Sequence, residues 1–121
     1  MTKPIIAIVD DDESVRRALS RLVRSLAYQT TDFPSGESFL VSLTNVIPCC
    51  ALLDMHMPGL DGLQVLEEMR SRKLTVPTII ITANSQPNMR ELCMKAGAAG
   101  YLQKPLDLDV VLSSIQSVAA A

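Results

Sequence analysis

The chain has few of the residues on which several classes of protein depend. Its three cysteines are an odd number without metal-ligand spacing, which argues against a disulfide framework or a zinc site. Its only histidine, His56, has no histidine or cysteine partner in register and is a poor candidate for a metal-ligating side chain or a phosphocarrier. No apolar run has transmembrane length, and residues 1–4 are too short for a signal peptide. A net charge of −2 offers no surface for nucleic acid. We therefore expect a cytoplasmic protein with reduced cysteines that contacts neither membrane nor nucleic acid.

Apolar runs alternate five times with stretches of helical periodicity. The 121 residues are 48% hydrophobic, enough for one domain with a full core, which we place at residues 1–121. The expected strands cover residues 5–9, 29–33, 49–53 and 100–103, and a further strand follows Pro77. Strict alternation of strand and helix with short loops indicates an α/β fold, with helices on both faces of a parallel sheet.

The helical stretches have recognisable caps and apolar faces. Asp12 and Ser35 are expected to cap the first two helices, which start near residues 14 and 36, and Gly97 is expected to end the fourth. The inward positions of the first, third, fourth and fifth helices are predicted to be Val15, Ala18, Leu19, Leu22, Val23 and Leu26; Leu63, Leu66 and Met69; Met89, Leu92, Cys93 and Ala96; and Leu108, Val111, Leu112, Ile115 and Val118. Most of the arginines of the first helix (Arg16, Arg17, Arg21 and Arg24) are interpreted as a solvated face.

Four apolar runs each end in a polar residue that can handle phosphate. Asp10-Asp11-Asp12 follows the first run, Asp54 the third, Thr82 the fourth and Lys104 the fifth. Ligands of open α/β sheets bind in the crevice at the carboxyl ends of the strands, so these side chains are expected to gather there. Carboxylates hold a hard divalent cation, and the cation with a lysine can neutralise a phosphoryl group.

On these motifs the chain resembles the receiver domain of two-component response regulators. The resemblance covers residues 4–118 and rests on Asp10-Asp11, on Asp54 with the following residues 55–62, on Thr82-Ala83 and on Lys104-Pro105. Each motif alone is weak, but all four in this order are specific. The resemblance implies a flavodoxin-like (βα)5 doubly wound parallel sheet with strand order 2-1-3-4-5 and a ligand crevice where the order reverses.

The resemblance also implies a phosphoacceptor and its cation. Asp54 would accept a phosphoryl group from a histidine kinase in a magnesium-dependent reaction, in which Mn²⁺ can replace Mg²⁺. Asp10, Asp11, Asp54 and the backbone carbonyl of His56 would hold the ion. Lys104 would pair with Asp54 before phosphorylation and with the phosphoryl oxygens afterwards. The peptide bond between Lys104 and Pro105 is expected to be cis.

Further residues of the family site are expected to switch the domain and to time it. Thr82 would donate its hydroxyl to the phosphoryl group, and Tyr101 would couple to Thr82 and report phosphorylation at the surface, although Tyr101 by itself reads as a half-buried strand residue. The side chains of His56 and Asn84 would border the path of the attacking water and set the lifetime of the phosphorylated state.

The expected output surface comprises the fourth helix, the strand at 100–103 and the fifth helix. It would control an output domain, expected to be transcriptional, or a partner protein, and a homodimer could form through it on phosphorylation. The kinase would dock at the end of the first helix beside the site, where Ser14 and Arg17 lie.

Two other functions fit part of the pattern. In a haloacid dehalogenase-type phosphatase Asp10 would be the nucleophile, since Asp10 and Asp12 have its D-x-D spacing, but Asp54 would be unexplained and no cap insertion exists. A receiver-like module that is never phosphorylated would not need the full acidic set. We expect no enzyme beyond self-phosphorylation and slow autodephosphorylation, and the chain is either a domain of a longer regulator or a stand-alone receiver that acts by docking.

Overall fold

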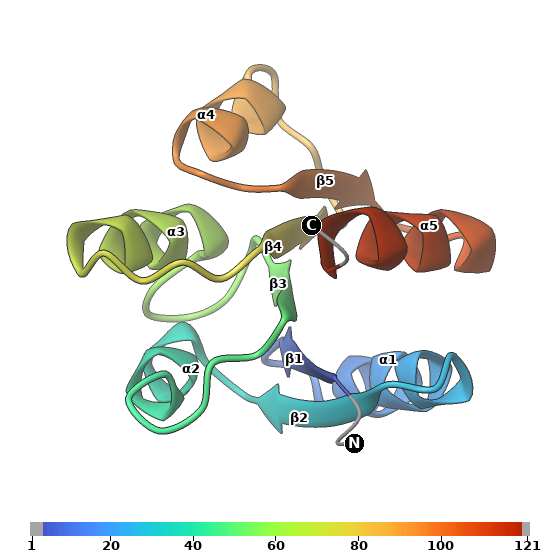
Figure 1. Cartoon of the computed structure of the whole chain (residues 1–121). Helices are drawn as coiled ribbons and strands as arrows, with labels where there is room; N and C mark the ends of the chain where they lie inside the picture. Colours follow the sequence, from blue (N-terminus) through green and yellow to red (C-terminus); the bar gives the residue numbers. More distant parts are fainter. Residues whose placement is uncertain (1–3, 120–121) are drawn as a thin grey trace.

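Five parallel strands form one sheet in the order β2-β1-β3-β4-β5 (Figure 1). The computed structural model describes residues 4–119. The strands are β1 (Ile5–Val9), β2 (Gln29–Phe33), β3 (Cys50–Asp54), β4 (Thr78–Thr82) and β5 (Gly100–Gln103). The predicted flavodoxin-like topology is confirmed, with β3 beginning one residue later than expected and including Asp54.

Five helices cover the two faces of the sheet. Figure 1 shows α1 (Glu13–Ser25) and α5 (Leu108–Ala119) on one face and α2 (Gly36–Ser42), α3 (Gly62–Ser71) and α4 (Met89–Lys95) on the other. None of the helices within residues 4–119 combines the length and the apolarity that crossing a membrane requires.

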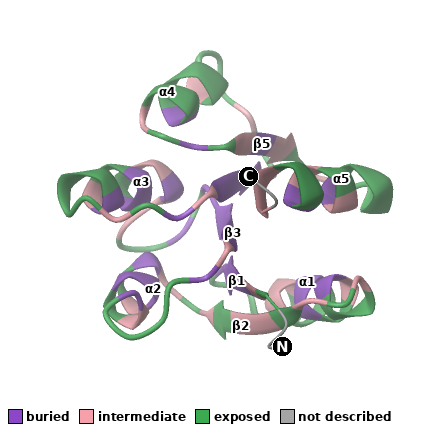
Figure 2. Ribbon diagram, viewed as in Figure 1, coloured by how far each residue is buried: buried purple, intermediate pink, exposed green. Residues whose placement is uncertain are grey.

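The central strands are apolar throughout because both of their faces are covered. β3 and β4 are buried along their whole length (Figure 2). Successive side chains of a strand point to opposite faces, so Ala51 and Leu53 join the core under α2, α3 and α4, whereas Leu52 joins the core under α1 and α5. Each large aliphatic side chain that is fully buried contributes roughly 1.5–3 kcal/mol. The sheet is thus a rigid platform for the residues at its carboxyl edge.

The predicted caps are present where the helices begin and end. The side chain of Asp12 accepts the backbone N–H groups of Ser14 and Val15, and the Ser35 hydroxyl accepts that of Ser38. Gly97 follows α4 with a φ of +110°, a left-handed conformation that favours glycine. These local signals are readable because a cap involves only residues close in sequence.

Three positions predicted to face the core are instead exposed. Leu92 is 48% exposed because α4 has only two turns, of which Cys93 is the fully buried residue. Leu108 is 50% exposed because it lies in the first turn of α5, before the helix reaches the core residues Val111 and Ile115. Ala18 is exposed because it borders a groove between α1 and the loop after β5.

Candidate functional site

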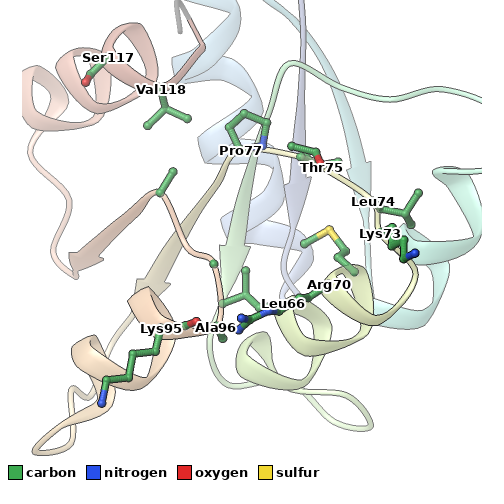
Figure 3. Close-up of a pocket in the computed structure, with 14 residues that line it drawn as sticks. Leu66, Arg70, Lys73, Leu74, Thr75, Pro77, Lys95, Ala96, Ser117 and Val118 are labelled. Carbon is green, nitrogen blue, oxygen red and sulfur yellow. Dashed lines mark hydrogen bonds between the residues drawn. The ribbon is translucent and has the colours of Figure 1, made fainter.

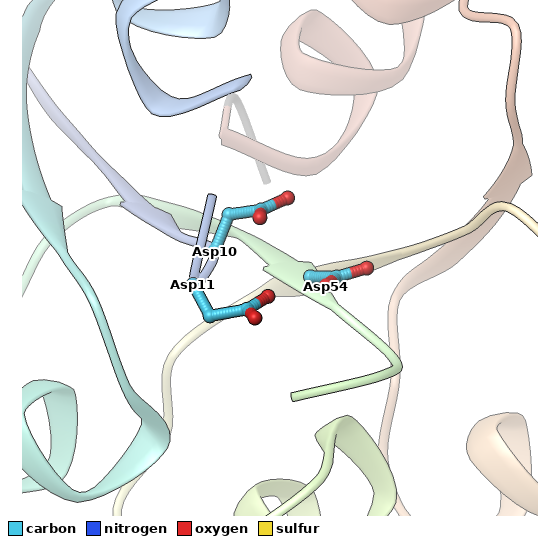
Figure 4. Close-up of side chains that lie close together, drawn as sticks. All are labelled: Asp10, Asp11 and Asp54. Carbon is cyan, nitrogen blue, oxygen red and sulfur yellow. The ribbon is translucent and has the colours of Figure 1, made fainter. Parts of the chain in front are cut away.

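Three carboxylates meet where β1 and β3 end side by side. Val9 at the end of β1 pairs with Leu53, so that Asp10 and Asp54 leave neighbouring strands at the same edge. Oxygen atoms of Asp10, Asp11 and Asp54 all lie within 4.8 Å of one another. Figure 4 shows the three side chains lying close together where these strands end. The structure therefore brings together the acidic residues that the sequence places at separate strand ends.

Two carboxylates of this cluster are buried, since Asp54 is 7% exposed and Asp10 is 3% exposed. Burial and, to a smaller extent, the nearby Asp10 carboxylate raise the pKa of Asp54 to about 6, although Lys104 and the backbone N–H of His56 act in the opposite direction. The lysine thus offsets only part of the charge. A cluster of three carboxylates with one nearby ammonium fits a hard divalent cation, because such ions prefer carboxylate oxygens.

Lys104 reaches the cluster from the end of β5. Its ammonium nitrogen lies 3.6 Å from Oδ2 of Asp10. The ion pair is therefore with Asp10 and not, as predicted, with Asp54, although the lysine still lowers the pKa of Asp54. The Lys104 backbone N–H donates to the carbonyl of Thr82 at 2.8 Å, which ties the end of β5 to the end of β4. The peptide bond to Pro105 is cis, as expected.

Thr82, Asn84 and His56 lie next to one another beside the cluster. Thr82 is fully buried, and its hydroxyl oxygen accepts the Asn84 backbone N–H at 3.2 Å. Nε2 of His56 lies 3.3 Å from the carbonyl oxygen of Asn84, so the bond needs a proton on that nitrogen. A hydrogen bond from the His56 side chain to the Asn84 backbone thus joins the two residues expected to set the phosphate lifetime.

Tyr101 points inward and is 9% exposed, more buried than the sequence alone indicates. Its hydroxyl is 2.8 Å from the Ser85 hydroxyl in the loop between β4 and α4. Sequence reasoning did not find Ser85, because a serine in a polar loop gives no signal of its own. Ser85 follows Thr82 by three residues, so the loop that carries the threonine also fixes the tyrosine.

Arg16 is the clearest difference from the sequence interpretation. Its side chain is 14% exposed and does not belong to a solvated face. The guanidinium donates from Nε to Oδ2 of Asp32 at 3.0 Å and from a terminal nitrogen to the carbonyl oxygen of Asp10 at 2.8 Å. The signal lies in the pairing of β1 with β2, which brings Asp32 beside the end of β1 and is not visible in helical periodicity.

A cavity on another part of the surface is remote from these residues. It has a volume of about 800 Å³ and lies among α3, α4, the start of β4 and the end of α5 (Figure 3). Its lining includes Arg70, Lys73 and Lys95 but none of the residues of the acidic site. The candidate chemistry thus belongs to the carboxyl edge of the sheet and not to this cavity.

Comparisons with known proteins agree with the fold and the strand-end residues. A family model described as response regulator receiver domain matches residues 6–116. The DNA-binding transcriptional regulator NtrC of Klebsiella pneumoniae is 37% identical over 115 residues, which are 95% of this chain and 24% of that protein. The transcriptional regulatory protein FixJ of Bradyrhizobium diazoefficiens is 33% identical over 116 residues, 96% of this chain and 57% of that protein. The chain thus spans between a quarter and somewhat over half of these relatives.

Solved structures of similar proteins have the same fold. The structure described as FixJ-N superposes with a TM-score of 0.91 at 28% identity and covers 99% of this chain and 96% of that one. Chemotaxis protein CheY4 of Vibrio cholerae superposes with a TM-score of 0.88 at 22% identity, covers 97% of this chain and 99% of that one, and supports the fold alone.

Proposed function

The chain belongs to the family of response regulator receiver domains, and from that premise we propose that Asp54 accepts one phosphoryl group from a sensor histidine kinase. The observation that carries the proposal is the buried Asp54 carboxylate, held within 4.8 Å of Asp10 and Asp11 at the crevice of the sheet. We take residues 1–121 as one receiver domain that acts in the cytoplasm as a switch and not as a turnover enzyme.

The proposed reaction is a transfer between two labile phosphoryl compounds. A carboxylate oxygen of Asp54 attacks the phosphorus of the kinase phosphohistidine in line, the P–N bond breaks, and an acyl phosphate forms. The departing imidazole of the kinase keeps the electron pair of that bond and takes a proton from solvent. Because the pKa of Asp54 is raised only to about 6, its carboxylate is ionised at neutral pH and ready to attack.

Mg²⁺, or Mn²⁺ in its place, would be held by the carboxylates of Asp10, Asp11 and Asp54 and by the carbonyl oxygen of His56. Such an ion, when bound, supplies positive charge to the oxygens of the transferring phosphoryl group. Lys104 is near enough to exchange Asp10 for a phosphoryl oxygen, since its ammonium is 3.6 Å from that carboxylate and 27% exposed.

The proposed readout begins at Thr82. A hydroxyl that turns toward the phosphoryl group releases the Asn84 N–H and pulls the loop whose Ser85 holds the Tyr101 hydroxyl. The surface of α4, β5 and α5 would change in consequence. That surface exposes four large apolar side chains between 40% and 50%, namely Leu92, Met94, Leu108 and Val110. A second copy or an output domain could cover them, and the relatives named as transcriptional regulators favour a transcriptional output.

The kinase would bind where α1 meets the loop after β5. An apolar depression of about 320 Å³ lies there beside Lys104 and is lined by Val15, Leu22 and Leu106. Arg17, 75% exposed on the same helix, is available to read a partner helix. This surface adjoins the acidic crevice, so a docked helix could present a phosphohistidine to Asp54.

The experiment that tests the proposal is labelling with acetyl phosphate and Mg²⁺, followed by intact mass. One phosphoryl group per chain is expected, and none in Asp54→Asn. Asp12→Asn is the matched control, because asparagine also caps helices and Asp12 is occupied in capping α1. Full labelling of Asp54→Asn would overturn the assignment. Multiple turnovers of a phosphate ester that are lost in Asp10→Asn would instead support the phosphatase.

A further inference from the structure

Arg16 links the end of β2 to the corner at which β1 turns into α1. Its guanidinium bonds both the Asp32 carboxylate at 3.0 Å and the main-chain carbonyl of Asp10 at 2.8 Å. Asp32 lies on the edge strand and is half exposed, whereas the Arg16 side chain is 14% exposed. The arginine thus clamps the backbone of the acidic corner against the edge of the sheet and bonds Asp10 through its carbonyl, not through its carboxylate.

The two acidic residues of this corner are held very differently. Asp10 is fixed through its N–H, which donates to Phe33, through its side chain, which accepts the Asp12 N–H at 2.9 Å, and through its ion pair with Lys104. Asp11 is exposed, and within residues 4–119 its side chain makes no hydrogen bond or ion pair. Something other than its own side-chain contacts must therefore direct the Asp11 carboxylate to Asp54.

The peptide that joins Asp10 to Asp11 supplies that direction. The Asp10 carbonyl and the Asp11 N–H lie in one plane with both Cα atoms, so a bond that fixes the carbonyl also fixes the start of Asp11. Arg16 makes that bond. We propose that Arg16 is a positioning residue, which orients the Asp10–Asp11 peptide so that the exposed Asp11 carboxylate completes the cation site. The inference rests on the proposed function in that the acidic cluster binds a divalent cation.

Charge and position predict opposite effects of removing Arg16, which makes the inference testable. A guanidinium beside an acidic cluster repels a cation, so its loss should tighten cation binding if charge alone mattered. Loss of a residue that orients a metal ligand weakens metal binding, by about 10- to 100-fold for close supporting contacts. The direction of the change thus separates the two roles.

The experiment measures Mn²⁺ affinity of the full chain without any phosphoryl donor, by electron paramagnetic resonance of the free ion. Arg16→Met is expected to weaken binding by about tenfold or more. Arg17→Met is the matched control, because it removes the same charge from the next residue of α1, which is 75% exposed and pairs with Glu13. Its affinity should stay equal to that of the wild type or rise slightly.

Arg16→Lys and Asp32→Asn extend the test to milder changes. Lysine keeps the charge but cannot supply the planar fork that bonds Asp32 and the Asp10 carbonyl together, so it should also weaken Mn²⁺ binding. Asp32→Asn should weaken binding in the wild type and add nothing in Arg16→Met, since Asp32 acts through the arginine. Unchanged or tighter binding in both Arg16 variants would overturn the inference while the wild type still bound Mn²⁺. Absence of binding in the wild type would overturn the proposed cation site as well.

Discussion

Replacing Asp54 with asparagine should make the metal-free domain more stable at neutral pH. The carboxyl of Asp54 has a pKa of about 6 in the folded chain against an ordinary value of 3.8, because burial and the Asp10 charge oppose its ionisation. At about 1.36 kcal/mol per pH unit, the difference corresponds to roughly 3 kcal/mol of stability that the ionised carboxylate costs the fold. Asparagine has a similar shape and no charge, so Asp54→Asn should recover at most about this amount.

The pH dependence follows from the direction of that change. Between about pH 4 and pH 6 the folded chain holds a proton on Asp54 that the unfolded chain has already released. The stability of the wild type therefore falls as pH rises through this range, and the loss is complete above it. Asp54→Asn has no such dependence. The two proteins should be nearly equal in stability at pH 4 and differ most at pH 7.

Urea denaturation followed by circular dichroism, with EDTA at pH 4 to 8, measures both quantities. In thermal unfolding, at about 4 °C per kcal/mol for a domain of this size, the gain in stability at pH 7 raises Tm by up to about 12 °C. Asp11→Asn is the matched control, because it removes a charge from the same cluster at an exposed position and should stabilise far less. Excess Mg²⁺ should shrink the advantage of Asp54→Asn. An Asp54→Asn protein that is no more stable than the wild type at pH 7, or equally favoured at pH 4, would refute the electrostatic argument.

Four further results are expected from single substitutions. Mg²⁺ at one hundred times Kd should stabilise the wild type by about 2.7 kcal/mol and raise its Tm, and Asp11→Ala should abolish that rise. An unchanged rise in Tm would place the ion elsewhere. His56→Ala should speed decay of the acyl phosphate about fivefold, because it removes the hydrogen bond of about 1 kcal/mol between His56 and the Asn84 carbonyl. An unaltered decay rate would contradict this role. Ser85→Ala should increase the population of the outward rotamer of Tyr101 about fivefold, as read from the NMR signals of the ring. An unchanged population would show that the 2.8 Å bond to Ser85 does not hold the ring. Arg17→Glu should slow transfer from the kinase about tenfold and leave acetyl phosphate labelling intact, whereas equal losses with both donors would indicate damage to the site.

The sequence predicts the parts of the site that lie at the ends of apolar strands. Asp54 and Thr82 end strands that are buried on both faces, and Lys104 follows the edge strand β5, so the strand order alone brings the three residues to one edge of the sheet. The caps at Asp12 and Ser35 are equally local, because each bonds a backbone N–H two or three residues ahead. Patterns of this kind need no knowledge of the neighbouring strand.

The parts that the sequence does not predict depend on which atoms meet across elements. Arg16 lies at a position that helical periodicity assigns to the solvated face, yet the length of its side chain carries the guanidinium back to the edge of the sheet. Lys104 has two buried carboxylates nearby, and its ion pair with Asp10 depends on interatomic distances that a strand pattern does not contain. Ser85 matters only because Tyr101 turns inward beside it.

In the proposed function, the cost of the acidic cluster would explain how phosphorylation of Asp54 reaches the rest of the domain. The burial that raises the pKa of Asp54 also makes its ionised form costly in the resting fold, and a bound cation would lower that cost. Thr82 and the tether of Lys104 to its carbonyl connect this change to β4 and β5, whose ends carry the loop with Ser85. A site whose carboxylates were already fully compensated would gain little stability from a bound cation. The uncompensated carboxylates thus make the domain less stable and more responsive for the same physical reason.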